Sequence, residues 1–222
     1  MNSAVHTSAT DLRITEIFYS LQGEARTVGC PTVFVRLTGC PLRCVYCDTA
    51  YAFSGGTMWP QAAVLKEVEG YTPRFVTVTG GEPLAQPACL PLLVALCDAG
   101  YEVSLETSGA LSVKAVDSRV IKVLDVKTPA SGEAHRNLYE NVDSLVPQDQ
   151  VKFVICDRAD YEWARFKIDE YAMADRVSDV LLSPSHGEVS PRELAEWILT
   201  DNLPVRLQVQ LHKLLWNDEP GR

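Results

Sequence analysis

The sequence lacks any hydrophobic run of about eighteen residues, the length that a membrane-spanning helix requires, so we expect no span within its 222 residues. It also lacks a basic segment followed by an apolar one at its start, which argues against a secretory signal. The polar stretch Met1–Leu12 is instead expected to be a frayed or disordered end. No internal repeat and no linker rich in Gly and Ser divides the chain, so we expect one domain over residues 1–222.

Positive charge is also scarce. The chain has 20 Lys and Arg residues against 29 Asp and Glu residues, which gives a formal net charge of −9. A protein that binds nucleic acid through its phosphates usually presents a basic surface. The charge balance therefore argues against a nucleic-acid partner, although a local basic pocket for a small anion is compatible with it.

The cysteines do not suggest a disulfide framework. There are seven, an odd number, and three of them lie within eight residues. Without a secretory signal, thiols are expected in a reducing compartment, so we expect a cytoplasmic protein. The remaining four lie in or beside apolar stretches and are expected to be small buried residues: Cys30, Cys89, Cys97 and Cys156.

Apolar runs and spaced apolar residues predict alternating strands and helices. The expected strands are Val33–Leu37, Phe75–Thr79, Glu102–Leu105, Ile121–Leu124, Val151–Ile155, Val180–Leu182, Val205–Val209 and, more weakly, Ile14–Tyr19. The expected helices are Pro60–Glu69, Pro87–Ala99, Asp160–Ala172 and Pro191–Leu199. This alternation favours parallel strands joined by right-handed crossovers.

Polar, charged or Gly-rich residues follow most of the expected strands. The cysteine loop follows Leu37, and Thr79-Gly80-Gly81-Glu82-Pro83 closes the next run. In a parallel barrel, the carboxyl ends of the strands carry the chemistry. With six or seven strands, we therefore expect an α/β fold of the incomplete (β/α)6 TIM-barrel type, open on one side, rather than a doubly wound sheet.

The most informative motif is Cys40-Pro-Leu-Arg-Cys44-Val-Tyr-Cys47. Soft thiolates suit iron–sulfur clusters, zinc or Cu(I), but structural zinc usually takes four protein ligands and the chain has no second Cys-x2-Cys pair. On a four-iron cluster, three cysteines leave one iron without a protein ligand. The amine and carboxylate of S-adenosylmethionine (SAM) can chelate that iron, and the reduced cluster can then cleave SAM to a 5′-deoxyadenosyl radical.

This spacing, with Tyr46 before the third cysteine, resembles the signature of the radical SAM superfamily, and Gly80-Gly81 resembles its glycine-rich element. From about residue 14 onward the chain also resembles the 7-carboxy-7-deazaguanine synthase family of the 7-deazapurine (queuosine) pathway. The motifs that carry this resemblance are Ser20-Leu21-Gln22-Gly23-Glu24, Phe34-Val35-Arg36-Leu37-Thr38-Gly39-Cys40, Cys47-Asp48-Thr49, Thr79-Gly80-Gly81-Glu82-Pro83, Glu106-Thr107-Ser108-Gly109 and Gln210-Leu211-His212-Lys213.

The resemblance implies a lyase that converts 6-carboxy-5,6,7,8-tetrahydropterin into 7-carboxy-7-deazaguanine with loss of ammonia, while SAM is regenerated. It implies a [4Fe-4S] cluster, SAM and Mg2+ as cofactors. It also implies an electron donor such as flavodoxin or ferredoxin, and a homodimer.

The resemblance further implies roles for individual residues. Cys40, Cys44 and Cys47 hold the cluster, and Thr49 binds Mg2+, a cation that prefers oxygen ligands. SAM contacts are implied for Tyr46, Cys47, Asp48, Gly81, Glu106, Asp125, Lys127, Ser183, Pro184, Ser185 and His186. Substrate contacts are implied for Leu21, Gln22, Gly23, Glu24, Arg36, Thr79 and His212.

Arg36 also stands out without the resemblance. It lies inside an apolar strand run, where a charge is costly unless it is paired, and its planar fork suits the carboxylate of a substrate. A solvated Arg36 on the outer face of the strand is the alternative. Two other functions stay open at this point, a glycyl-radical-enzyme activating enzyme and a zinc-stabilised binding module.

Overall fold

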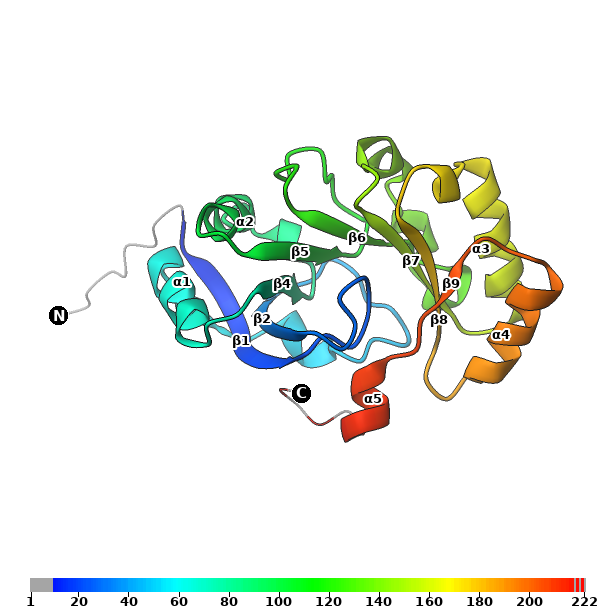
Figure 1. Ribbon diagram of the computed structural model, residues 1–222, viewed down its shortest axis with the longest axis horizontal. Coiled ribbons are helices and arrows are strands. Elements are labelled where there is room, and N and C mark those ends of the chain that lie inside the picture. Colours follow the sequence, from blue (N-terminus) through cyan, green and yellow to red (C-terminus); the bar gives the residue numbers. More distant parts are fainter. Residues whose placement is uncertain (1–9, 218, 220, 222) are drawn as a thin grey trace.

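One curved sheet organises the chain (Figure 1). The computed structural model describes residues 10–217, 219 and 221. In this part of the chain, the sheet has nine strands in the order β3-β1-β2-β4-β5-β6-β7-β8-β9. Their bounds are β1 Leu12–Leu21, β2 Pro31–Leu37, β3 Thr57–Trp59, β4 Phe75–Gly80, β5 Glu102–Thr107, β6 Ile121–Asp125, β7 Gln150–Ile155, β8 Asp179–Pro184 and β9 Arg206–Leu207.

Neighbouring strands along the stretch β2-β4-β5-β6-β7-β8-β9 pair in parallel, as the alternating pattern predicts. The sheet does not close, because β3 and β9 are its two edges. The expected incomplete barrel is therefore confirmed. The expected strand Ile14–Tyr19 is longer than predicted and pairs antiparallel with β2 on one side and with β3 on the other.

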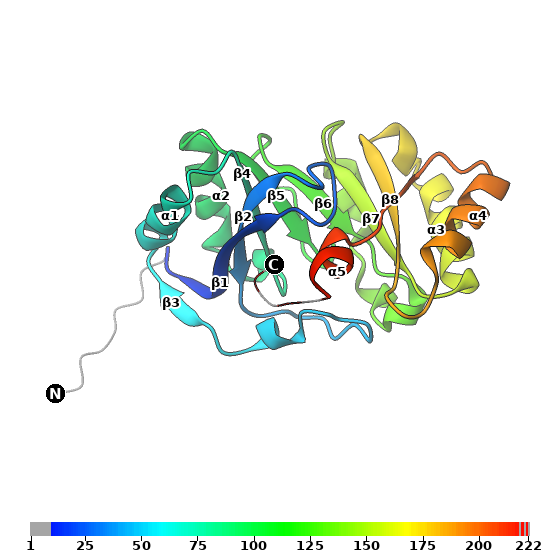
Figure 2. The same cartoon turned by 60° about the horizontal axis from the view of Figure 1, so that its bottom comes forward.

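Helices cover the convex side of the sheet. The four expected helices are present as α1 Gln61–Gly70, α2 Cys89–Asp98, α3 Arg158–Glu170 and α4 Pro191–Thr200. A fifth helix, α5 Leu211–Trp216, was not predicted, and Figures 1 and 2 show it on the other side of the sheet, near the loop that follows β2. Short 3-10 turns replace a helix between β6 and β7, namely η3 Pro129–Ser131, η4 Ala134–Arg136 and η5 Tyr139–Ser144. The remaining 3-10 turns of the described residues are η1 Ala50–Phe53, η2 Pro83–Ala85 and η6 Met173–Asp175.

The alternation of side chains along each strand separates the core from the functional face. In β2, Val33 and Val35 are fully buried in the main core, whereas Phe34 and Arg36 line a pocket on the concave side. The other strands repeat this pattern, since β7 buries Phe153 and turns Lys152 toward the pocket. In β2 and β7 the charged residue therefore lies on the concave face, whereas Lys122 of β6 does not line the pocket and pairs with the buried Asp149 at 2.8 Å.

Two expectations about packing need correction. The start of the chain was expected to fray through Leu12, but Leu12 begins β1 and is fully buried; residues 1–9 of that segment lie outside the described ones. Of the four cysteines outside the motif, Cys89 alone is fully buried, and the other three are partly exposed. Among the described residues, no helix is long and apolar enough to cross a bilayer.

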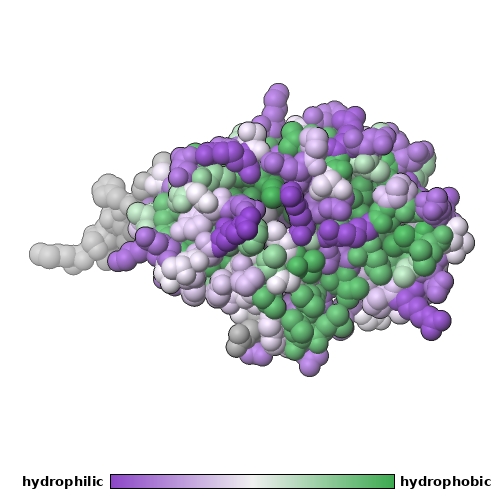
Figure 3. Space-filling model, viewed as in Figure 1, coloured by the Kyte–Doolittle hydropathy of each residue, from purple (hydrophilic) through white to green (hydrophobic). Residues whose placement is uncertain are grey.

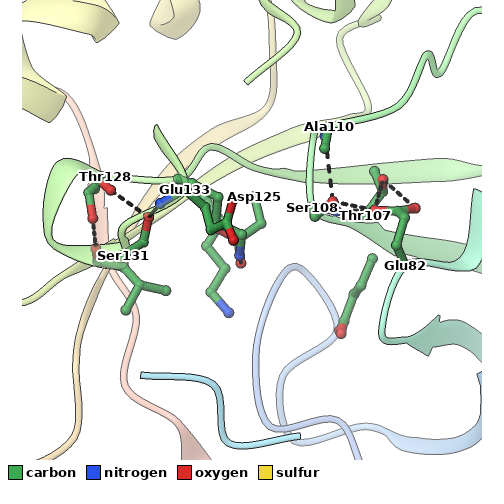
Figure 4. A network of polar contacts seen from close by, with 12 residues as sticks. Glu82, Thr107, Ser108, Ala110, Asp125, Thr128, Ser131 and Glu133 are labelled. Atoms are coloured by element: carbon green, nitrogen blue, oxygen red, sulfur yellow. Dashed lines mark hydrogen bonds and ion pairs between the residues drawn. The ribbon is translucent and has the colours of Figure 1, made fainter. Parts of the chain in front are cut away.

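A buried carboxylate fixes the ends of β4 and β5 relative to each other. Glu82 has no exposed surface, and it accepts hydrogen bonds from Thr107 Oγ1 (2.9 Å), Ser108 N (2.7 Å) and Ser108 Oγ (2.5 Å) (Figure 4). The backbone N–H of Leu84 is a further donor at 2.9 Å. Because all these partners are donors, the site suits a carboxylate and no other side chain.

We expect Glu82→Gln to lower the free energy of unfolding by about 2 kcal/mol, because the amide NH2 would face donors that then lack an acceptor. Urea unfolding of the protein, followed by circular dichroism, measures this change. Glu196→Gln, at an exposed position of α4, is the matched control and should shift stability little. Equal stability of the Glu82 variant and the control would show that the network does not support the sheet.

Candidate functional site

A pocket of about 560 Å3 lies on the concave side, at the carboxyl ends of the parallel strands. Every residue for which the sequence predicted a role lines this pocket. They are Leu21, Gln22, Gly23, Glu24, Arg36, Cys40, Cys44, Tyr46, Cys47, Asp48, Thr49, Thr79, Gly81, Glu106, Asp125, Lys127, Ser183, Pro184, Ser185, His186 and His212. The structure thus brings all these residues together in one pocket, while the role of each residue stays a prediction.

The three cysteines of the motif share one wall of the pocket and are all partly buried. Burial raises the pKa of each thiol, to about 11 for Cys44, and the positive charge of Lys127 acts against this rise. Among the described residues, no three His, Cys, Asp or Glu side chains converge closely enough to hold a single metal ion. Three soft donors spread along one wall fit a cluster, in which each thiolate takes a different iron.

The turn after β4 lies directly against the cysteine loop. Gly81 N donates to Leu37 O (3.2 Å), and Glu82 N donates to Gly39 O (2.8 Å). A Cβ atom on Gly81 would lie 2.3 Å from Gly39 O and 2.7 Å from the Cβ of Cys40. Only glycine allows this approach, so Gly81 is needed for the cysteine loop to pack against this turn.

A buried ion pair stands beside the cysteines. Lys127 Nζ lies 2.9 Å from Asp125 Oδ2, while Asp125 Oδ1 is buried without a hydrogen-bond partner among the described residues. Burial works against the charge of Lys127, but Asp125 and Cys44 outweigh it and raise the lysine pKa. The lysine therefore stays charged and favours the thiolate form of the nearby cysteines. The unpaired carboxylate oxygen is an acceptor for a ligand hydroxyl or amine.

A second polar group lies deeper in the pocket. Glu106 is partly buried and accepts from Thr79 Oγ1 (2.9 Å) and from Gln22 Nε2 (3.4 Å). Burial and the charge of Glu24 raise the pKa of Glu106. The sequence predicted a SAM contact for Glu106, but the structure places it among the residues predicted to contact the substrate.

Lys152 is a pocket residue that sequence reasoning missed. Its ammonium group pairs with the carboxylate of Glu24. Burial disfavours its charge, but Glu24, Asp125 and Glu106 outweigh that cost and raise its pKa. Glu24 Oε1 has no hydrogen-bond partner among the described residues, so this oxygen is available to a ligand. The available signal was a lone lysine in the apolar run of β7, the same signal that singled out Arg36.

Arg36 lines the pocket, which rules out the solvated alternative. Its Nε donates to Glu16 Oε1 at 2.7 Å, and Tyr51 donates to the same oxygen at 2.8 Å. Its guanidinium carbon lies 5.7 Å from the ring centre of Phe18 and 5.8 Å from that of Tyr51. The described residues hydrogen-bond only Nε, so both terminal nitrogens of this pocket-lining side chain are available to an anionic ligand.

The C-terminal helix forms part of the rim. Leu211 N donates to Gly23 O at 3.0 Å, and a Cβ on Gly23 would lie 2.4 Å from Nδ1 of His212. Asp48 links this segment to the cysteine loop through Gln210 Nε2 (3.3 Å) and Lys213 Nζ (3.5 Å).

The neighbouring residues Asp48 and Thr49 contact each other on the pocket rim. Thr49 Oγ1 donates to Asp48 Oδ1 at 2.9 Å. Burial opposes ionisation of Asp48, but the hydrogen bond from Thr49 and the charges of Lys213 and Lys152 outweigh it and lower its pKa. Two oxygen-bearing side chains next to Cys47 suit a hard cation such as Mg2+.

The fold and the site define a radical SAM protein, and residues 34–125 match the radical SAM superfamily. The chain is 45% identical to 7-carboxy-7-deazaguanine synthase of Koribacter versatilis, covering 94% of this chain and 98% of the relative. It is 43% identical to the Chlorobaculum tepidum protein of the same name, covering 94% and 96%. The crystal structure of QueE from Escherichia coli is 25% identical, with a TM-score of 0.74 over 91% of this chain and 95% of that one. The chain belongs to the 7-carboxy-7-deazaguanine synthase family.

We expect Gly81→Ala to displace the cysteine loop, since overpacking of this kind costs about 1–3 kcal/mol. Anaerobic reconstitution followed by iron analysis should give less than a full cluster per chain and weaker SAM binding. Gly70→Ala is the control, because nothing lies within 4 Å of a Cβ at that position. Full iron content and normal SAM binding in the Gly81 variant would contradict the need for this close approach.

Proposed function

We propose that the chain converts 6-carboxy-5,6,7,8-tetrahydropterin into 7-carboxy-7-deazaguanine with loss of ammonia. Its family makes it a radical SAM lyase of 7-deazapurine biosynthesis that uses a [4Fe-4S] cluster and SAM. The observation that carries the specific reaction is one pocket that contains both the three thiols and a ring of buried polar groups suited to a pterin.

The cysteine wall is the proposed cluster site. Cys40, Cys44 and Cys47 each ligate one iron, and Lys127 balances part of the negative charge beside them. With SAM, the reduced cluster supplies a radical able to abstract hydrogen from an unreactive carbon. The surrounding residues bind and orient the two organic molecules and exclude water from them.

The polar group of Gln22, Glu24, Glu106 and Thr79 is the proposed pterin site. The unpaired Oε1 of Glu24 accepts hydrogen bonds, as the 2-amino and N3–H edge of a pterin requires. Lys152 pairs with Glu24 and orients its carboxylate in this role. A site built of such paired donors and acceptors rejects analogues that lack the matching groups. Arg36 then binds the substrate carboxylate through its terminal nitrogens.

SAM occupies the rest of the pocket in this proposal. Asp125 Oδ1 is an acceptor for the ribose or amino group, and the Gly81 backbone admits the methionyl part. Thr49 is the proposed Mg2+ ligand. The remaining proposed SAM contacts are Tyr46, Cys47, Asp48, Lys127, Ser183, Pro184, Ser185 and His186, with Leu21, Gly23 and His212 closing the substrate side.

Family membership decides against both alternative functions, the glycyl-radical activating enzyme and the zinc-stabilised module. The relatives that show the family match nearly the whole chain. A pterin therefore remains the proposed substrate rather than a loop of a partner protein.

The cellular setting is also part of the proposal. We propose a single-domain cytoplasmic enzyme that receives electrons from a carrier protein, and all seven thiols are free, as a reducing compartment requires.

A homodimer is proposed as well. Apolar side chains gather over α5 (Figure 3), where Leu214 is 69% and Leu215 is 49% exposed, and a second copy is the proposed cover for this face.

The direct test incubates the anaerobically reconstituted protein with carboxy-tetrahydropterin, SAM, Mg2+ and dithionite, and detects product by mass spectrometry. We expect 7-carboxy-7-deazaguanine from the wild type and none from Cys44→Ala, which loses a cluster ligand. Cys97→Ala, at a cysteine outside the pocket, is the matched control and should stay active. If the wild-type protein carried an intact cluster and cleaved SAM but formed no deazaguanine, the proposed conversion of the pterin would be ruled out.

We expect Arg36→Ala to raise the KM for the pterin by about 10- to 100-fold, the cost of hydrogen bonds to a charged group. The KM for SAM should change little, because Arg36 lies on the substrate side. Arg74→Ala removes an exposed ion pair with Glu102 instead and is the control. An unchanged pterin KM in the Arg36 variant would rule out the carboxylate contact.

A further inference from the structure

The barrel interior carries hydroxyl groups one layer below the ligand pocket, because alternate residues of β4 and β5 face the concave side. In β4, Thr77 lies below the pocket residue Thr79. In β5, Ser104 lies below the pocket residue Glu106. The parallel register places Thr77 beside Ser104. Parallel barrels usually fill such a layer with branched apolar residues, so these two hydroxyls need hydrogen-bond partners.

The side chain of Gln22 supplies that partner from the loop after β1. Gln22 is 3% exposed, and its Nε2 donates to Thr77 Oγ1 at 3.1 Å. The hydroxyl oxygens of Thr77 and Ser104 are 2.8 Å apart. The backbone of Gln22 is held on both sides, since its N donates to Cys30 O at 2.9 Å and its O accepts from Gly29 N at 2.8 Å. With the backbone fixed, the side-chain contacts decide where the amide points.

The neighbouring donors and acceptors fix which end of the amide faces which group. The backbone N–H of Glu24 can only donate, and it reaches Gln22 Oε1 at 3.2 Å. Nε2 therefore turns the other way, where Thr77 accepts one of its hydrogens and Glu106 Oε1, at 3.4 Å, accepts the other. Because Thr77 Oγ1 accepts from the amide, its own hydrogen goes to Ser104 Oγ. Both N–H groups of the amide are thus used inside the protein, and the second lone pair of Oε1 is left for a ligand.

We infer that Thr77, supported by Ser104, is a positioning residue that sets the amide of Gln22 so that Oε1 meets an N–H group of the bound pterin. Thr77 is 1% exposed and does not line the pocket, so it acts through Gln22 and not by touching the ligand. The inference rests on the proposed pterin site and adds a specificity to it. An amide that turned over would present an N–H group to the same ligand donor and would disfavour it.

The first test measures steady-state kinetics of the reconstituted holoenzyme. Thr77→Val keeps the shape of the side chain but removes the acceptor of Nε2, so the KM for the carboxy-tetrahydropterin should rise about 5- to 10-fold, the worth of roughly one hydrogen bond. The kcat should change little, because uniform binding of the ring is lost. Thr77→Ser retains the hydroxyl and should keep the wild-type KM. Thr15→Val is the matched control, since it breaks a hydroxyl pair with Thr38 (2.7 Å) at a residue that does not line the pocket.

A double-mutant cycle separates positioning from a general loosening of the barrel. Gln22→Met removes the amide, so adding Thr77→Val to that variant should leave the pterin KM where Gln22→Met puts it. Ser104→Ala removes the partner of the Thr77 hydroxyl and should raise the KM in the same direction, which provides the test if Thr77→Val does not fold. A further rise in the Gln22→Met background, or no rise in the single variants, would overturn the inference.

A readout without pterin separates this inference from the proposed reaction. In the oxidised holoenzyme with 15N-labelled glutamine side chains, NMR detects the two Nε2 hydrogens of Gln22, which are assigned by their loss in Gln22→Met. These hydrogens should exchange with solvent about tenfold faster in Thr77→Val than in the wild type, and equal rates would contradict control of the amide by Thr77. If the rates differ as expected but the wild type forms no deazaguanine, the proposed reaction fails and the positioning role of Thr77 stands.

Discussion

The contact between the turn after β4 and the cysteine loop is the constraint on which the site depends. Glu82 N–H donates to Gly39 O, and the absence of a side chain at Gly81 lets the two backbones meet. The buried Glu82 carboxylate then anchors this turn to the end of β5. One short stretch therefore joins two strands of the barrel to the loop that bears the three thiols.

The parallel strands supply the rest of the pocket by a simple rule. Alternate side chains enter the apolar core, and the others face the concave side. Arg36, Lys152 and Glu106 are charged residues on that second face, and each is paired or hydrogen-bonded within the protein. Buried oxygens of Glu24 and Asp125 lack a hydrogen-bond partner among the described residues, and we propose that a ligand completes the network there. In this proposal the partly buried charges are part of the binding site.

Much of this arrangement could be predicted from the sequence, because it depends on local patterns. The strands, the four outer helices and the polar residues at the strand ends follow from periodicity and from the parallel architecture. The features that could not be predicted from the sequence depend on contacts between distant segments. Glu16 pairs with Arg36 only because of the antiparallel register of β1 and β2, and α5 reaches the rim only by docking on Gly23. Neither contact leaves a signal within its own segment.

In the proposed site, Cys40, Cys44 and Cys47 hold a four-iron cluster and leave one iron for SAM. Mössbauer spectroscopy of the 57Fe-reconstituted protein, recorded with and without SAM, tests it most directly. We predict that one iron of the cluster changes its isomer shift when SAM is added, while the three thiolate-bound irons do not. A spectrum that SAM leaves unchanged, with all four irons equivalent, would contradict the account.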